Sequence, residues 1–165
     1  MKTTVLLPGT YDPPTRGHLA VIEAAARRFD EVRAVIFVNP KKTCLFPLSD
    51  RLEFLRLATA GLPNVTVGFS DGLVADYVRE NGIGFIVKGV RNERDFLYER
   101  DMADWNAAHG AETLFLPAPP EVQQISSTVL RERLKAGLPI DDVAASGTSD
   151  AILAAYRRLS LDNGD

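Results

Sequence analysis

A loop rich in glycine, proline and threonine lies near the start of the sequence and reads Pro8-Gly9-Thr10-Tyr11-Asp12-Pro13-Pro14-Thr15-Arg16-Gly17-His18. The apolar run 3–7 before it predicts a buried strand, and apolar residues at near-helical spacing over 19–29 predict a helix after it. Free N–H groups at the start of such a helix form an anion site. Gly9 lets the backbone approach a ligand, and His18 can donate to a phosphate. We interpret the loop as a nucleotide phosphate site; the alternative is an ordinary connection with a surface histidine.

Strand and helix patterns alternate along the rest of the sequence. Further strands are predicted over 32–38, 65–69, 85–87 and 113–116. Further helices are predicted after a cap at Ser49 or Asp50, from Asp71 to Glu80, over 93–108, after caps at 126–128, and over 149–159. This alternation predicts an α/β fold, a Rossmann-like five-stranded parallel sheet with helices on both faces. We expect one domain over 1–165, because no repeat, low-complexity tract or linker interrupts the chain.

Composition limits the kind of protein and its partners. The 165 residues are 45% hydrophobic and 25% charged, which is ordinary for a globular protein. The net charge of −3 argues against binding to nucleic acid, and no membrane span or secretory signal is evident. Cys44 is the single cysteine and is expected to be a small, half-buried residue, and the cytoplasm is the expected location. Two histidines and one cysteine cannot build a typical zinc site, so no protein-held metal is expected.

Polar and basic residues follow the predicted strands at their carboxyl ends. They are Thr10, His18, Lys42, Lys88, Arg91 and the helix start Ser126-Ser127-Thr128. In a parallel sheet these ends meet at one edge, which is where ligands bind. The sequence therefore predicts that these side chains gather at one site.

Three familiar catalytic patterns are missing. No G-x-G-x-x-G follows the first predicted strand, and no G-x-x-x-x-G-K-[ST] occurs, so a dinucleotide dehydrogenase and a P-loop enzyme are disfavoured. Neither His18 nor His109 has a nearby nucleophile of the G-x-S-x-G kind, which argues against a serine hydrolase.

Two short motifs resemble those of the nucleotidyltransferase superfamily. Residues 15–18 read T-R-G-H and resemble its T/H-x-G-H motif, and residues 125–128 read I-S-S-T and resemble its I-S-S-[ST] motif. Within the superfamily the sequence is similar to bacterial phosphopantetheine adenylyltransferases over residues 3 to about 158. The segments 8–13 and 39–42 fall where that family has them, and the stretch K-G-V-R-N-x-x-D-F-x-Y-E over 88–99 is the specific one.

The resemblance implies adenylyl transfer from ATP to 4′-phosphopantetheine, giving dephospho-coenzyme A and pyrophosphate, the penultimate step of coenzyme A synthesis. The acceptor phosphate attacks the α-phosphorus in line, and pyrophosphate leaves with Mg²⁺. Such chemistry needs positioning and charge stabilisation but no protein nucleophile. The resemblance also implies a homohexamer and coenzyme A as a feedback ligand.

The resemblance assigns roles to individual residues. The catalytic set is Thr10, His18 and Lys42; Thr10 and Lys42 would hold the acceptor phosphate and His18 would donate to the α-phosphate. The acceptor site comprises Thr10, Lys42, Val74 and Lys88. The ATP site comprises Thr10, Tyr11, His18, Gly89, Val90, Arg91, Glu99, Val122, Gln123, Gln124, Ile125, Ser126, Ser127 and Thr128.

Plainer interpretations stand beside these roles. Arg91 and Glu99 could form a solvated salt-bridge pair, Ser126–Thr128 could simply cap a helix, and Val74 could belong to the core. Two departures from the family also matter. Lys88 stands where the family usually has arginine and lacks its bidentate fork, and 122–124 replace bulky residues, which leaves the adenine contacts open.

The sequence leaves two alternative functions open. The first is another transferase of the same superfamily, with nicotinamide mononucleotide or a small phosphoalcohol as acceptor. The second is a nucleotide-binding regulatory module without catalysis, whose mark would be a broken T-x-G-H motif; here the motif is intact.

Overall fold

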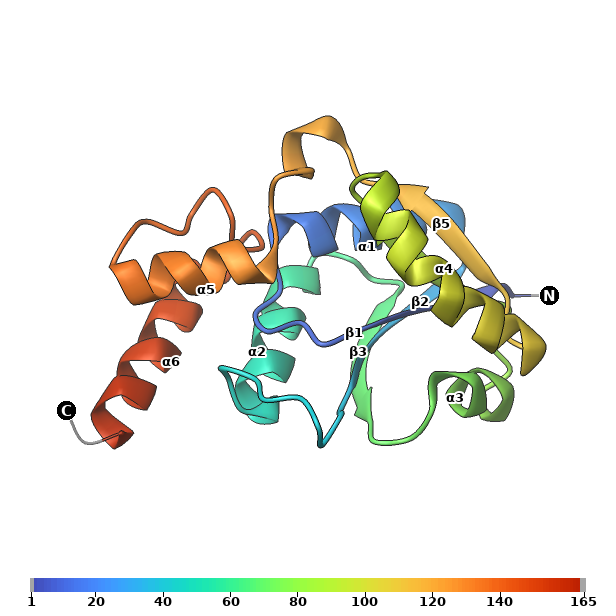
Figure 1. Ribbon diagram of the computed structural model, residues 1–165, viewed down its shortest axis with the longest axis horizontal. Coiled ribbons are helices and arrows are strands. Elements are labelled where there is room, and N and C mark those ends of the chain that lie inside the picture. Colours follow the sequence, from blue (N-terminus) through green and yellow to red (C-terminus); the bar gives the residue numbers. More distant parts are fainter. Residues whose placement is uncertain (1, 164–165) are drawn as a thin grey trace.

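A parallel sheet forms the centre of the protein, whose computed structural model describes residues 2–163. Its strands are β1 (Thr4–Gly9), β2 (Glu31–Phe37), β3 (Val65–Ser70), β4 (Phe85–Val90) and β5 (Thr113–Pro117). Their order is β3-β2-β1-β4-β5, with every neighbouring pair parallel (Figure 1). The order places β1 in the middle and confirms the predicted five-stranded α/β fold.

Helices follow the strands along the chain. They are α1 (Arg16–Arg28), α2 (Leu48–Thr59), α3 (Val74–Glu80), α4 (Glu93–Ala108), the short 3₁₀ helix η1 (Pro120–Val122), α5 (Ser127–Ala136) and α6 (Ser149–Asp162). No helix in the described part of the chain is long and apolar enough to cross a membrane.

Successive β1 side chains feed two different cores, because side chains alternate between the faces of a strand. Val5 and Leu7 pack with α1 and α2 in one buried cluster, whereas Leu6 packs with α3 in another. Helices therefore cover both faces of the sheet, as predicted. A third cluster joins α5 and α6 to α2 and to Phe46, so these helices form one end of the molecule (Figure 1).

Two predicted helix starts are wrong. Helix α2 begins at Leu48 after Pro47 and has no side-chain cap, so Ser49 and Asp50 lie inside its first turn. Helix α3 begins at Val74 rather than Asp71, because 71–72 form a bend in which the Ser70 hydroxyl accepts the Gly72 N–H (3.1 Å). Helix α1 starts at Arg16, earlier than the apolar spacing alone indicated, because Thr15 caps it.

Candidate active site

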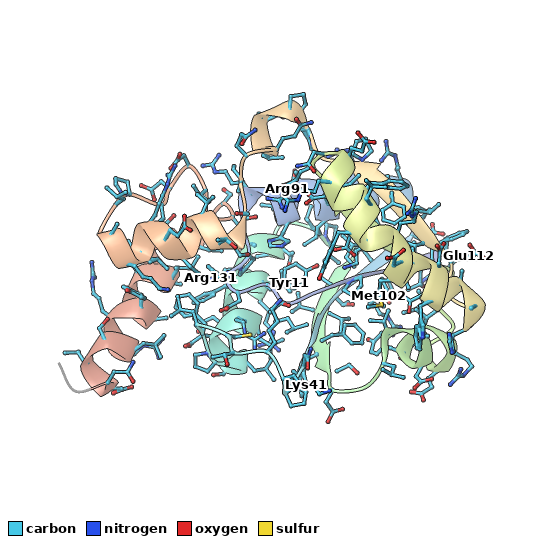
Figure 2. All side chains as sticks on the ribbon, viewed as in Figure 1. Tyr11, Lys41, Arg91, Met102, Glu112 and Arg131 are labelled. Carbon is cyan, nitrogen blue, oxygen red and sulfur yellow. The ribbon has the colours of Figure 1, made fainter. Side chains whose placement is uncertain are left out.

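The carboxyl edge of the sheet collects the loops after β1, β2 and β4 and the start of α5. Figure 2 labels Tyr11, Arg91 and Arg131 around this edge. Two hydrogen bonds tie the segments together: Arg91 Nη1 donates to the Ile125 carbonyl (3.4 Å), and Arg131 Nη1 donates to the Asp12 carbonyl (2.8 Å). The loops predicted to meet at one edge therefore do meet there.

His18 is held by the start of α1. The Thr15 hydroxyl accepts the His18 backbone N–H (3.3 Å), and His18 Nδ1 accepts the Thr15 backbone N–H (3.0 Å). Because Nδ1 is an acceptor in this capping box, a neutral ring carries its proton on Nε2. The local fold thus leaves Nε2–H as a donor.

The His18 ring is neutral at physiological pH. Burial, followed by the positive charges of Lys88 and Arg91, lowers the pKa of His18 from 6.5 to about 4. A neutral imidazole close to two cations can donate a hydrogen bond to an anion without first losing or gaining a proton. This matches the donor role predicted for His18, which stays a prediction.

Tyr11 supports this histidine from within the fold. Its ring lies 4.9 Å from the His18 ring centroid, and its buried hydroxyl donates to the Leu7 carbonyl (2.9 Å). Burial raises the pKa of Tyr11. A Cβ at Gly9 would lie 3.0 Å from the Tyr11 ring, so a larger residue would displace it. Because the Tyr11 side chain is buried and bonded within the protein, only its backbone remains available for the predicted contact with ATP.

Thr10 and Lys42 come together from different loops. Lys42 Nζ donates to Thr10 Oγ1 (3.2 Å) beside a cavity of about 190 Å³. The cavity is lined by Thr10, Phe37, Val38, Asn39, Lys42, Cys44 and Arg51. Cys44 is half-buried, as expected. Val74 does not line this cavity; it packs partly buried against the α3 core, which favours the plainer interpretation.

Two basic residues, Lys88 in β4 and Arg91 directly after it, form ion pairs. Lys88 Nζ lies 3.5 Å from Glu99 Oε2, and Arg91 Nε lies 2.8 Å from Asp95 Oδ2. Arg91 lowers the pKa of the Asp95 carboxyl, mainly through this hydrogen bond. Arg91 and Glu99 are therefore each paired, but with other partners than the plainer interpretation suggested.

A groove lies next to Arg91 and is lined by Val90, Arg91, Asn92, Glu93, Phe96, Pro117 and Gln123. It contains three of the residues predicted to bind ATP: Val90, Arg91 and Gln123. Gly89 adjoins it in sequence, and a Cβ there would lie 2.5 Å from Val21 Cγ2 on α1, so glycine permits the close contact between β4 and α1.

The start of α5 faces the first loop. Ser126 caps the helix by accepting the Val129 N–H (3.2 Å), and the Ser127 hydroxyl donates to the Pro13 carbonyl (2.8 Å). The capping interpretation therefore holds for Ser126. Upstream, Val122 is buried, the Gln123 amide donates to the Ala118 carbonyl (3.2 Å), and Gln124 is exposed.

Three residues of the site were not predicted: Asp12, Arg51 and Arg131. Arg131 Nη2 donates to Thr128 Oγ1 (3.2 Å), so its guanidinium stands beside the predicted phosphate residues of α5. Its position one helical turn after Thr128 is a signal that the sequence offered. Asp12 and Arg51 bond mainly to distant backbone groups, which no local pattern reveals.

Metal-binding side chains are sparse here. Among residues 2–163, no group of three or more histidine, cysteine, aspartate or glutamate side chains is placed to hold an ion. A Mg²⁺ ion prefers phosphate oxygens and water in addition to a few protein oxygens.

Comparison with known proteins gives the chain its relatives. It matches the Cytidylyltransferase-like family over residues 6–133. Phosphopantetheine adenylyltransferase of Symbiobacterium thermophilum is 43% identical over 144 residues, covering 86% of this chain and 89% of that one. The protein of the same name from Bifidobacterium longum is 45% identical over 138 residues, covering 82% and 83%.

Solved structures share the fold at lower identity. A putative nicotinate-nucleotide adenylyltransferase from Vibrio parahaemolyticus superimposes with a TM-score of 0.71 at 19% identity, covering 95% of this chain and 96% of that one. A bifunctional NMN adenylyltransferase/ADP ribose pyrophosphatase from Francisella tularensis gives 0.68 at 17%, covering 99% and 53%. Identity this low bears on the fold alone, whereas the closer relatives cover most of the sequence. The chain is therefore a member of the phosphopantetheine adenylyltransferase family of cytidylyltransferase-like nucleotidyltransferases.

Proposed function

We propose that the chain transfers the adenylyl group of ATP to 4′-phosphopantetheine and releases dephospho-coenzyme A and pyrophosphate. Its membership of the family supports this function. The observation that carries it is the neutral His18 ring. Its Nδ1 accepts the Thr15 N–H, so its Nε2–H is available as a donor, and Lys88 and Arg91 supply positive charge nearby. That arrangement suits a site in which anionic groups must meet.

The reaction needs no bond to the protein. A phosphate oxygen of 4′-phosphopantetheine attacks the α-phosphorus of ATP, the bond from that phosphorus to the bridging oxygen breaks, and pyrophosphate leaves with the electron pair. Thr10 and Lys42 hold the attacking phosphate, and His18 donates to the α-phosphate oxygens as their charge grows. Donors fixed before the reaction stabilise this charge without reorganising.

The triphosphate extends towards α5. Arg91 and the hydroxyls of Ser127 and Thr128 lie on this side, and Arg131 stands against Thr128. Mg²⁺ enters with ATP as part of the substrate and neutralises charge on the pyrophosphate. Glu99 lies on the nucleoside side, where it must part from Lys88 once Lys88 turns to the acceptor phosphate.

A substrate comparison tests this function. Pyrophosphate release is measured with ATP and 4′-phosphopantetheine, with ATP and nicotinamide mononucleotide, and with CTP and glycerol phosphate. We expect turnover with the first pair. Turnover with either other pair and none with 4′-phosphopantetheine would assign the chain to a different branch of the superfamily.

We propose in addition a homohexamer that coenzyme A inhibits. Helix α4 exposes a run of large apolar side chains: Leu97, Tyr98, Met102 and Trp105. Apolar patches of this kind mark interaction surfaces. Light scattering coupled to size exclusion tests the assembly, and inhibition kinetics with added coenzyme A test the feedback. The cytoplasmic location also stays a prediction.

A further inference from the structure

The loop that carries Lys42 has no regular secondary structure of its own. It connects β2 to α2, and Lys42 itself is exposed. Its ammonium group nevertheless meets Thr10, which lies 32 positions earlier, at 3.2 Å. A long side chain on an exposed loop loses rotamer freedom in such a contact, so its position needs support from the surrounding structure.

Asp12 binds this loop from the β1 side. Asp12 is 5% exposed, and its carboxylate accepts two backbone N–H groups, from Leu45 at 2.7 Å and from Phe46 at 2.9 Å. Each carboxylate oxygen takes one of these donors. Bonds to an ionised acceptor are among the stronger ones in proteins. Asp12 thereby fixes the end of the Lys42 loop against the first loop.

Arg51 binds the same loop from the α2 side. The residue is 5% exposed; its Nε donates to the Phe46 carbonyl and its Nη1 to the Thr10 carbonyl, both at 3.0 Å. No carboxylate of the described residues lies within ion-pair distance of it. A buried guanidinium is costly unless its donors are satisfied, and here they serve two carbonyls from different loops.

Together these bonds close a ring. The Phe46 residue is held at its N–H by Asp12 and at its carbonyl by Arg51, and Arg51 returns to the carbonyl of Thr10. The Phe46 side chain adds a further anchor, because it is buried with its ring edge-on to Phe54 at 5.1 Å. The ring of bonds fixes the backbone of Thr10 relative to the loop of Lys42.

We propose that Asp12 and Arg51 are positioning residues that set the distance between Thr10 and Lys42 and so shape the seat of the acceptor phosphate. The inference rests on the proposed function, in which Thr10 and Lys42 hold that phosphate. Asp12 does not line the cavity beside Thr10 and Lys42; Arg51 lines it, but its Nε and Nη1 are bonded to the carbonyls of Phe46 and Thr10. Lysine at position 51 keeps the charge but has no fork that reaches two carbonyls.

The test compares Arg51→Lys and Asp12→Asn with the control Arg33→Lys. Arg33 lies in β2, bonded to Glu31 and Asn81, and does not line the cavity beside Thr10 and Lys42. For both test variants we expect the KM for 4′-phosphopantetheine to rise about ten- to hundredfold, the loss that one hydrogen bond to a charged group represents. The KM for ATP should stay at the wild-type level in both test variants. In the control Arg33→Lys, the KM values for both substrates should stay at the wild-type level.

A second measurement does not depend on turnover. Titration with inorganic phosphate, followed by the amide NMR signals of Thr10 and Lys42, should show the same rise in Kd in both test variants. If wild-type protein binds phosphate there but does not adenylylate 4′-phosphopantetheine, the proposed function fails while the positioning role holds. If both substrates lose affinity together with a lowered Tm, or if phosphate binding is unchanged, the positioning role is overturned.

Discussion

The two sides of the active site are built differently. On the β1 side, Tyr11, Asp12 and Thr15 are buried, and their side chains bond mostly to backbone groups. On the α4 side, the helix buries only Asn106 among its described residues. Its charged residues instead pair with basic side chains at the end of β4, Glu99 with Lys88 in the strand and Asp95 with Arg91 directly after it.

This difference separates fixed groups from exchangeable ones. A buried side chain bonded to the main chain keeps its place whether or not a ligand is bound, because breaking such a bond leaves an unsatisfied polar group. A partly exposed ion pair is worth about 0–1 kcal/mol and can be traded for a phosphate. The β1 side is therefore held in place by its own bonds, whereas we expect the α4 side to exchange partners when substrate binds.

The strongest test of the fixed side is His18→Ala. We expect kcat to fall about 10²–10³-fold, as for the loss of one charge-stabilising donor, with ATP binding largely retained. Initial rates of pyrophosphate release and equilibrium dialysis with ATP measure the two effects. A kcat within about threefold of wild type would contradict the donor role, since such donors contribute far more.

The neutral state of His18 predicts a pH dependence of stability. Its pKa is lowered from 6.5 to about 4 in the folded protein. Between these values the unfolded chain binds more protons than the folded one, so stability rises with pH and is lost as the pH falls from 6.5 towards 4. Between pH 4 and 6.5, Tm should therefore depend more steeply on pH in the wild type than in His18→Gln. Equal slopes of Tm against pH would show that His18 is not responsible.

The exchangeable side is tested at Lys88. Lys88→Ala should raise the KM for 4′-phosphopantetheine about tenfold or more, because a charged donor to phosphate is lost. Lys88→Arg should lower this KM, since the guanidinium fork binds two phosphate oxygens at once. Substrate-saturation curves measure both changes. Equal values for the two variants would mean that Lys88 stays with Glu99 in the working enzyme.

Sequence patterns captured the fold because the driving forces are local. The strands are rich in apolar residues, and helices such as α1 and α5 have apolar residues at helical spacing, so the alternation was visible without tertiary information. Because neighbouring parallel strands end at the same edge of the sheet, the loops after β1 and β2 bring Thr10 and Lys42 into contact there. The start of α2 was missed because Ser49 and Asp50 are favoured N-cap residues, whereas the helix begins at Leu48 after Pro47, which forms no side-chain cap.

The supporting contacts of the site could not be read in this way. Arg51 bonds to Thr10 across 41 positions and Arg131 bonds to Asp12 across 119. Both bonds end on carbonyl oxygens, which every residue carries, so no residue type at the other end marks the partner. The pairing of Lys88 with Glu99 likewise depends on how α4 lies over β4, which the sequence does not specify.

Thr15→Ala gives a moderate effect on the fixed side. It removes the hydroxyl that caps α1 but keeps the backbone N–H that bonds to His18 Nδ1. Loss of such a cap costs about 0.5–2 kcal/mol of stability, so Tm should fall while kcat changes far less than in His18→Ala. Denaturant unfolding and initial rates measure both. A kcat as low as that of His18→Ala would show that the hydroxyl, rather than the backbone, orients the imidazole.

The smallest effect is expected for Asp95→Asn, matched with Asp12→Asn as its buried counterpart. The Arg91–Asp95 pair is partly exposed, and its loss should change the free energy of unfolding by about 0–1 kcal/mol. Because Arg91 lowers the pKa of Asp95, the pair stabilises the fold above the ordinary carboxyl pKa of 3.8, and this contribution is lost as the pH falls through the lowered value. Asp95→Asn should therefore not lose this contribution to stability when the pH falls.

Asp12→Asn turns an amide NH₂ towards a backbone N–H, so it should cost about 1–3 kcal/mol at neutral pH. Equal losses in denaturant unfolding would mean that the two sides of the site do not differ in rigidity.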